Sequence, residues 1–546
     1  MHPASRRKTN LYTFRGRKGT AVMAALLILS VLNFAAFIIP GNLLDFFGTG
    51  TMSRINLISY APEVWLSLLA LVFGTLIIVI SIASESTPKL IDLFVEDYKS
   101  RLFIWLITLS GLENIFLQLI HTQQTVFLDN LIFLNNYLLL PTFVVLSIPY
   151  IFYILKYTKN SNVIEKIFDD NRRTIKHARK IKDSSVDINR NQLNLFETIN
   201  QLHDLLQHVR FKEPKADIIH KFGISLRYYL NRKKMFPDSY FILGGEIKRD
   251  ISFRTLTEKF PQVERERTFY EQKVLRIFGT SYQLLIQDGH YDLASLCANE
   301  LYETGKSAAE LGDKHAVSVV LLHFNTLLRH GINHGLKTKE IRNVFNTIYH
   351  YSQLIDFLIK RNETDRIIEC CKYIAFYGNE VNRLAKSESA FVFLIDAFAT
   401  ELKKILITLY DKKFPRDLQS RVLKVFNELK SGEEVSPRKN RVRNNGFRLI
   451  QIILCLHYIN QEEQEFSETI IDYMIRDLNG ADKEVAKRAI TNDCDRITEQ
   501  REEFWEDTDQ GNSNIFYTPH KDQLSKFHAY FLYRLSSHAT QSAAGW

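Results

Sequence analysis

The chain has few cysteines, and none lies in its first half. Their number is odd and no two of them form a CxxC pair, which excludes a disulfide framework and argues against a zinc site built from them. We expect free, reduced thiols in a cytosolic domain, with no metal and no cofactor. The five are Cys297, Cys370, Cys371, Cys455 and Cys494.

The sequence also lacks the common catalytic signatures. It contains no GxxxxGK[ST], no GxGxxG after a strand, no GxSxG and no HExxH. His323 and His330 lie seven residues apart, and His334 joins their helical face only if the helix runs through Gly331. The pair His203-Asp204 resembles that of metal-dependent phosphohydrolases of the HD class, but no suitable partner residues follow. Packed or surface histidines are the favoured interpretation, and the chain is predicted not to be an enzyme.

No dense basic helix with interleaved aromatic residues is present, so a nucleic-acid partner is not expected. The net charge of +9 splits into +6 over residues 1–20, −4 over residues 21–155 and +7 over the remainder. Part of this last excess of positive charge lies just after residue 155. Near a bilayer, each of these charges would be attracted to anionic lipid headgroups with a free energy of roughly 1 kcal/mol. The predicted anionic-lipid contacts are Arg172, Arg173, Lys176, Arg179 and Lys180.

Long apolar runs dominate the N-terminal part, although the mean hydropathy of the whole chain is only −0.14. Four runs approach the roughly 20 residues that cross a bilayer core: 20–44, 64–84, 102–120 and 130–155. The first run is too long for the apolar core of a cleaved signal peptide, which favours a signal anchor. Pro141 and Pro149 should bend the fourth span.

The distribution of Lys and Arg predicts an orientation in the membrane. Six precede the first span, only Arg54 lies in the 41–61 loop, three lie in the 85–101 loop and none in residues 121–129. Both termini are therefore expected in the cytoplasm of a multi-pass cell-membrane protein, with the bacterial inner membrane favoured. The 85–101 loop has the pattern of a short amphipathic helix, which either lies on the inner membrane surface or extends the third span.

The third span has one polar side. Ionisable groups inside a bilayer are costly, so this side should face protein or water. In one interpretation it lines an aqueous path in which Glu113 sets ion preference. In the other its side chains hold helices together. The stripe consists of Ser110, Glu113, Asn114, Gln118 and His121, and Asn135, Asn136 and Tyr137 are its expected partners in either case.

Beyond residue 156 the periodicity is helical nearly throughout. The predicted fold is all-α, with four transmembrane helices followed by a large α-solenoid-like cytoplasmic domain. The domains are a basic N-terminus (1–20), a transmembrane domain (21–155), juxtamembrane helices with an irregular connector (156–262), a helical-hairpin array (263–430), and C-terminal helices with a polar tail (431–546).

Several segments carry more specific expectations. The heptad-like stripe of residues 186–210 pairs either with a helix of another protomer or with the core of its own chain. Residues 211–262, which contain Pro214, Pro237 and Pro261, should be irregular. The segment 331–335 should end a helix, residues 499–520 should form a loop, and the tail from residue 536 should be disordered. Asn325, Arg329, Asn343 and Asn346 form a polar set that hydrogen bonding between helices would explain.

The segment Ser81–Ile107, SIASESTPKLIDLFVEDYKSRLFIWLI, resembles part of a family of predicted four-span bacterial membrane proteins of unknown function. Members have two spans, an inner segment that begins near a Ser/Thr-Pro, two further spans and a long cytoplasmic tail. The resemblance implies a membrane location and no specific activity.

Two functions fit these features. The first is an oligomeric channel-like or transport protein, with a path lined by the polar face of the third span and regulated by the cytoplasmic helices. The alternative is a membrane-anchored helical-repeat scaffold or signalling protein that binds a cytoplasmic protein partner. Four spans exceed the requirement of an anchor, which slightly favours the first. The expected partners are the lipid bilayer, further copies of the chain and, for the scaffold alternative, a cytoplasmic protein.

Overall fold

In the computed structural model the chain is helical almost throughout and divides into two compact units. One unit holds the helices up to residue 167 together with residues 207–214, and the other holds residues 168–206 and everything from residue 215. The structure describes residues 7–38, 51–86, 98–120, 126–156, 160–181, 184–363, 366–385, 389–429, 446–478, 483–508 and 511–543.

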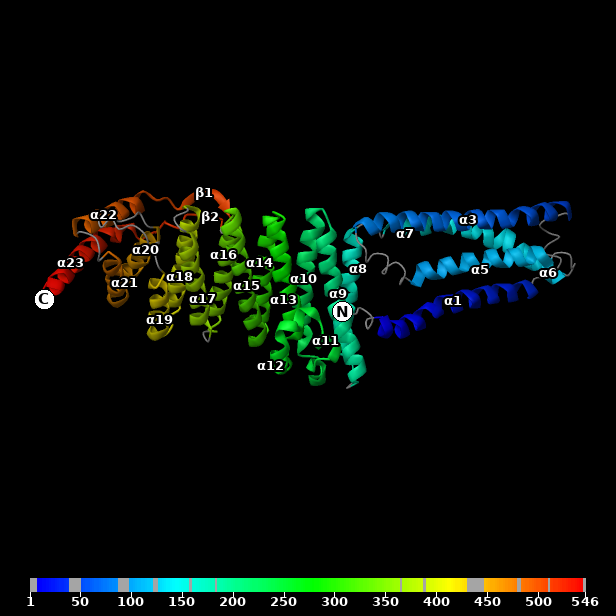
Figure 1. Cartoon of the computed structure of the whole chain (residues 1–546), viewed down its shortest axis with the longest axis horizontal. Coiled ribbons are helices and arrows are strands. Elements are labelled where there is room, and N and C mark those ends of the chain that lie inside the picture. Colours follow the sequence, from blue (N-terminus) through cyan, green and yellow to red (C-terminus); the bar gives the residue numbers. More distant parts are fainter. Residues whose placement is uncertain are drawn as a thin grey trace. The chain divides into compact units, whose positions relative to one another are not determined.

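The first unit is a bundle of apolar helices (Figure 1). Its elements are α1 (Arg7–Ile38), α3 (Thr51–Ser86), α5 (Tyr98–Ile120), α6 (Val126–Phe133), the π-helix η1 (Leu134–Leu139) and α7 (Leu140–Lys156). Helix α5 packs against α1, α3, α6 and η1, so the span with the polar stripe lies among the other helices of the bundle. The core between α3, α5 and α7 is aromatic: the ring centroids of Phe103 and Tyr150 lie 4.1 Å apart, and those of Trp65 and Phe143 lie 5.7 Å apart.

Large apolar side chains cover the outside of this bundle. Leu27, Phe34, Phe116, Leu119 and Phe152 are each more than three-fifths exposed. Contiguous exposed apolar surface is costly in water and expected against lipid. Three helical segments are long and apolar enough to cross a membrane by length and composition: Tyr60–Ile78, Tyr98–Ile120 and Asn130–Ile154.

The first predicted span is described only in part. Within α1 the apolar stretch is Thr20–Phe34, which is shorter than the other three, and residues 39–50 lie outside the described part of the chain. Most of the predicted amphipathic helix also lies outside it, since residues 87–97 are not described.

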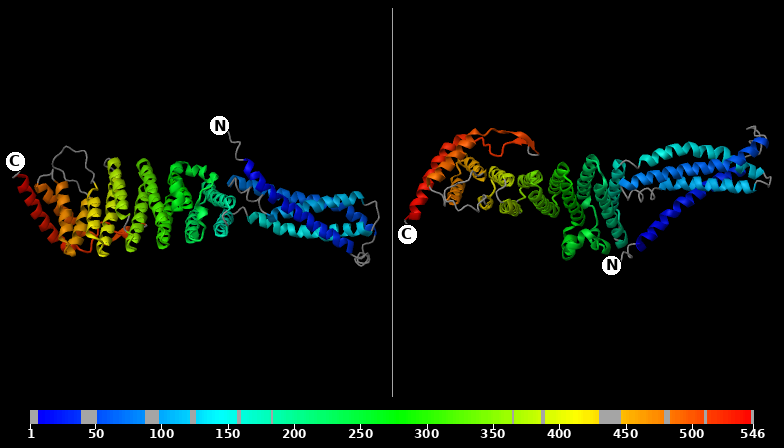
Figure 2. Two further views of the ribbon diagram at one scale, coloured as in Figure 1. Left: turned by 90° about the horizontal axis from the view of Figure 1, so that it is seen from below. Right: turned by 45° about the horizontal axis from the view of Figure 1, so that its top comes forward.

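The second unit is a stack of antiparallel helical hairpins (Figures 1 and 2). Its first elements are α8 (Asn160–Ala178), which begins in the first unit, α9 (Ser185–His208), α10 (Lys212–Lys233), η2 (Asp238–Phe241), α11 (Gly245–Lys248), η3 (Ile251–Lys259) and α12 (Phe260–Glu266). The array follows with α13 (Phe269–Gln287), α14 (Tyr291–Glu310), α15 (Lys314–Thr338), α16 (Arg342–Lys360), α17 (Ile367–Ala385), α18 (Ser389–Asp411) and α19 (Arg416–Asn427). Its last helices are α20 (Gly446–Asn460), α21 (Gln464–Asp477), α22 (Lys483–Glu499) and α23 (Leu524–Ala543).

From α13 to α18, each helix contacts the next helix and the next but one. Two layers result, with α13, α15, α17 and α19 in one and α14, α16, α18 and α20 in the other. The alternation of buried and exposed residues over 291–300 recurs unchanged over 341–350. The all-helical, repeat-like fold expected from the sequence is therefore confirmed, with stacked helix pairs as its unit.

The hairpin turns follow the predicted breaks at two glycines. Gly289 and Gly312 adopt φ values of +74° and +70°, a left-handed conformation that favours glycine. The predicted break at residues 331–335 is wrong, because α15 continues to Thr338. A Cβ on Gly331 would lie 2.8 Å from the hydroxyl oxygen of Tyr282, so this glycine permits close packing of α13 and α15.

Other sequence expectations also need correction. The prediction of irregular structure over residues 211–262 is wrong for residues 212–233, because α10 is a regular helix that holds Pro214 in its first turn, where a missing N–H costs nothing. The connector that follows consists of short helical turns. Residues 499–520 are not all loop, since β1 (Glu503–Thr508) pairs antiparallel with β2 (Gly511–Ser513). The tail expected to be disordered continues α23 to Ala543.

The heptad-like apolar stripe predicted for residues 186–210 lies on α9 and packs against the same chain. Its residues Ile188, Leu195, Ile199, Leu202 and Leu206 are buried. This outcome matches the intrachain alternative. Buried polar groups fix the neighbouring helices. Asn171 of α8 donates from Nδ2 to Thr198 Oγ1 of α9 at 2.8 Å and to the Tyr270 hydroxyl of α13 at 3.1 Å.

A buried ion triad ties α10 to the hairpins. Lys233 Nζ lies 2.5 Å from Glu271 Oε1 and 2.6 Å from Asp313 Oδ2. Burial disfavours the charged amine, but the two carboxylates outweigh it and hold the pKa of Lys233 above its ordinary value. Removing one member would leave an uncompensated charge in the interior.

Candidate functional sites

A hydrogen-bond network joins the polar side chains of the apolar bundle. Glu113 of α5 accepts from Asn33 of α1 through Oε1, and from Asn135 of η1 through Oε2 at 3.3 Å. The carboxylate thus joins α1, α5 and η1. Asn33 was not among the predicted partners, because one polar residue in an apolar run produces no periodic signal.

Asn135 is the centre of the network. Its Oδ1 accepts from Trp65 Nε1 of α3 at 3.0 Å and from Asn114 Nδ2 at 3.0 Å, and its Nδ2 donates to the Ser110 carbonyl at 3.2 Å. Asn114 also donates to Asn136 Oδ1. Four helical elements of one chain therefore share these bonds, which is the arrangement expected of polar contacts between helices in a membrane.

A wide helical turn presents both asparagines to the same partner. Within η1, the consecutive residues Leu134, Asn135 and Asn136 are all buried, whereas an α-helix turns successive side chains 100° apart. Pro141 lies two residues after the end of η1 and has no N–H to donate to the carbonyl four residues earlier. The sequence predicted a bend at this proline but not the π-turn before it.

The residues of the predicted polar stripe on α5 differ in their exposure. Ser110 and Asn114 are buried, Glu113 is half-buried and Gln118 is exposed on the surface of the bundle. His121 lies outside the described residues. Tyr137 is more than a third exposed, and Asn135 and Asn136 make the contacts with the stripe.

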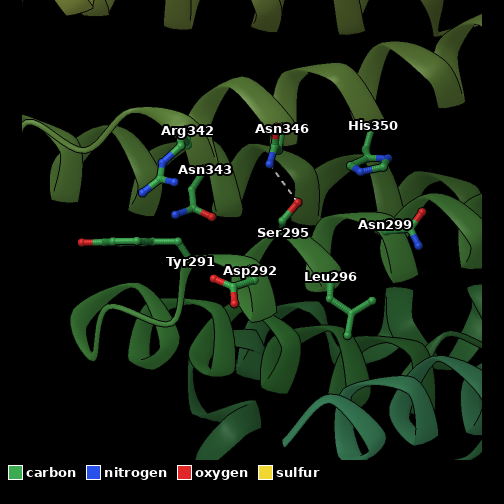
Figure 3. A pocket seen from close by; sticks show the side chains of 9 residues that line it. All are labelled: Tyr291, Asp292, Ser295, Leu296, Asn299, Arg342, Asn343, Asn346 and His350. Carbon is green, nitrogen blue, oxygen red and sulfur yellow. Dashed lines mark hydrogen bonds between the residues drawn. The ribbon is translucent and has the colours of Figure 1, made fainter. Parts of the chain in front are cut away.

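The second candidate site is a groove of about 600 Å³ between α14 and α16 (Figure 3). Ligand sites commonly have volumes of this size. In Figure 3 the side chains of the two helices face each other along the groove. The lining residues are Tyr291, Asp292, Ser295, Leu296, Asn299, Arg342, Asn343, Asn346 and His350.

Asn343 is the unusual member of this lining. It is 4 % exposed, and neither its Nδ2 nor its Oδ1 has a hydrogen-bond partner among the described residues. Its backbone is held, because its carbonyl accepts from Thr347 Oγ1 at 2.7 Å and from the Tyr282 hydroxyl at 3.5 Å. A buried carboxamide without partners costs about 1–3 kcal/mol.

The prediction that helix-to-helix bonds explain this polar set is confirmed for Asn346 and wrong for Asn343. Asn346 Nδ2 donates to Ser295 Oγ across the groove at 3.0 Å, drawn as a dashed line in Figure 3. At the end where both helices begin, Arg342 lies over the ring of Tyr291 at 5.7 Å and pairs with both carboxylate oxygens of Glu340 at 3.0 Å.

The five predicted lipid-contact residues, from Arg172 to Lys180, are all exposed, on α8 and the turn after it. The guanidinium of Arg172 lies 4.8 Å from the ring centroid of Tyr228, and Arg173 pairs with Asp170 at 3.3 Å. Contact with anionic lipid stays a prediction.

The histidines singled out in the sequence are partly or fully buried, and so are the cysteines of the second unit. Because α15 runs through Gly331, His323, His330 and His334 do lie on one helix, but burial lowers the pKa of His323 to about 3. Burial also lowers the pKa of His203, against the effect of Asp204. Among the described residues no group of three His, Cys, Asp or Glu side chains is placed to hold a metal ion. The five cysteines are unpaired and buried.

No protein-family model and no curated protein matches the chain, so the resemblance over Ser81–Ile107 stays a prediction. A solved structure described as "Circular tandem repeat protein with novel repeat topology and enhanced subunit contact surfaces" aligns with 86% of this chain and 99% of its own at 10% identity. The TM-score is 0.24, which is too low to indicate a shared fold.

Proposed function

We propose that this protein is a membrane-anchored scaffold, in which the apolar bundle is the anchor and the helical array binds a segment of another protein. The observation that supports it most is the contrast between the two sites. The polar side chains of the bundle bond mainly to one another within the chain, while the array leaves a buried carboxamide without a partner in a groove.

The surface of the bundle supports the membrane part of the proposal. Its exposed apolar side chains and three helices of spanning length suit a hydrocarbon environment. With both termini in the cytoplasm, as the Lys and Arg distribution predicts, the array would meet cytoplasmic partners.

A channel-like or transport role is the second candidate. One observation favours it: Glu113 is only half-buried, and a half-buried carboxylate in an apolar bundle suits an ion path formed with further copies of the chain. Its two hydrogen bonds to Asn33 and Asn135 count against a free carboxylate.

Ion flux separates the two candidates. The purified full chain is reconstituted into liposomes, and flux is recorded at several voltages and membrane tensions, with Glu113→Gln as the matched variant. The scaffold proposal expects no flux above protein-free liposomes for either protein. Flux in the wild type that falls in Glu113→Gln would establish the channel role instead.

Photo-crosslinking tests the scaffold directly. A crosslinking side chain placed at Asn299, in the groove, should give a discrete adduct with a second protein in native membranes. The same side chain at the exposed Asp417 of α19 is the control. Failure to form any adduct specific to position 299 would contradict binding at the array.

A further inference from the structure

We propose that the groove between α14 and α16 binds an extended peptide by its main chain, with the Asn343 carboxamide pairing with the N–H and C=O of one peptide residue. This inference rests on the proposed scaffold function. It specifies the kind of ligand and the residue that binds it. The observation behind it is a side chain 4 % exposed, in the lining of a groove, whose donor and acceptor both lack a partner among the described residues.

The chemistry of a carboxamide favours the main chain of an extended peptide as its ligand. An asparagine side chain offers an N–H donor beside a carbonyl acceptor, which is the complement of the N–H and C=O of a main chain. In an extended chain the N–H and C=O of one residue point to the same side, so two bonds to that residue would satisfy both orphan atoms. Because the Asn343 carbonyl is fixed by Thr347 and Tyr282, the backbone that carries the carboxamide is already held in place before binding.

The dimensions of the groove suit a short extended segment. Its lining on α14 runs from Tyr291 to Asn299, about 12 Å at the rise of an α-helix. An extended chain advances about 3.3 Å per residue, so roughly four residues fit along this length. Tyr291 and Leu296 supply apolar surface for side chains, and Asn299 adds a second carboxamide at the far end (Figure 3).

The charges of the groove argue against a strongly charged ligand. Arg342 is neutralised by its two-point contact with Glu340, and Asp292 adds a negative charge to the same lining. A phosphate or a free carboxylate would therefore find no unpaired cation among the described lining residues. Neutral main-chain recognition fits better than anion binding.

The proposal is tested with a library of random linear peptides, selected against the full chain in lipid nanodiscs. Peptides that bind are synthesised and titrated against wild type, Asn343→Leu and the control Asn231→Leu, which changes an exposed asparagine of α10. We expect about tenfold weaker binding to Asn343→Leu and unchanged binding to Asn231→Leu. Leucine has nearly the shape of asparagine and removes the orphan atoms, so Asn343→Leu should melt no earlier than wild type.

An ester scan then locates the contact. Each main-chain amide of a selected peptide is replaced in turn by an ester, which removes one N–H donor. One ester should weaken binding to wild type about tenfold and leave binding to Asn343→Leu unchanged. If the library yields no binder, if binders ignore position 343, or if no ester shows this dependence, the inference is overturned. The flux and crosslinking results stand apart from these outcomes, so a failure here is distinguishable from failure of the scaffold function.

Discussion

The apolar bundle and the helical array differ in how their most prominent buried amide side chains are paired. In the bundle, amide side chains and one carboxylate bond across four helical elements, and the outer surface is apolar. At the array, Lys233 of α10 is buried between Glu271 and Asp313, and the Asn343 carboxamide is left without a partner in a groove. The hydrogen bonds of the bundle join its helices to one another. The unpaired carboxamide of Asn343 is instead available to bind a ligand in the groove.

The largest expected effect comes from removing the buried cation that α10 contributes to the array. Lys233→Met leaves Glu271 and Asp313 without their partner, and we expect a loss of about 3–5 kcal/mol in the free energy of unfolding of the array. The measurement is urea-induced loss of helical signal of the full chain in detergent.

A surface pair provides the control for that variant. Lys360 lies 2.6 Å from Asp356 with more than half of its side chain exposed, so Lys360→Met should cost less than about 1 kcal/mol. Equal losses for the two variants would mean that the triad contributes no more than a surface pair.

A second buried charge of the array should make stability depend on pH. Burial raises the pKa of Asp396 to about 7, and its Oδ1 has no hydrogen-bond partner among the described residues. The folded chain then holds this proton more tightly than the unfolded chain, so the contribution of Asp396 falls as the pH rises from about 4 to about 7 and stays low above that.

Asp396→Asn removes this pH dependence. The variant should be roughly 2–4 kcal/mol more stable than wild type at pH ~8 and similar to it at pH ~4. Melting curves of both proteins at the two pH values test this, with Asp417→Asn as an exposed control. A variant that is less stable at both values would show that Asp396 is charged and paired in the fold.

The bundle should respond less to the loss of its central amide. Asn135→Leu removes the acceptor of Trp65 and one acceptor of Asn114, and we expect a loss of about 1–2 kcal/mol, because hydrogen bonds between membrane helices are modest in strength. Unfolding by sodium dodecyl sulfate, followed by circular dichroism, measures it. Thr142→Val, which loses only a bond of 2.6 Å to the Leu138 carbonyl, should stay within about 0.5 kcal/mol of wild type.

The sequence predicted the periodic features of both regions well. Apolar runs located the helices of the bundle, helical spacing located the hairpins of the array, and the stripe around Glu113 was visible because its residues recur on one face of a helix. The turns at Gly289 and Gly312 were visible as local signals.

Features that depend on tertiary contacts were missed. Asn33 could not be linked to Glu113, which lies 80 residues later in the chain. Pro214 suggested irregular structure, but it lies in a first helical turn where proline is tolerated. Gly331 suggested a break, but it permits close packing. The lack of partners for Asn343 follows only from where α14 and α16 meet, which no local pattern records.

The central claim is that the polar side chains of α5 hold helices together and do not line an aqueous path. The access of water to this side of α5 tests that claim most directly. Ser110→Cys places a thiol at a position that is 0 % exposed, while the five native cysteines are buried and give little background. Proteoliposomes are treated with a water-soluble maleimide, with Ser161→Cys on an exposed position of α8 as the labelled control. We expect Ser161→Cys to label rapidly and Ser110→Cys to stay unlabelled, because the network is closed within the bundle. Rapid labelling at position 110 would show an aqueous path along α5 and contradict the account.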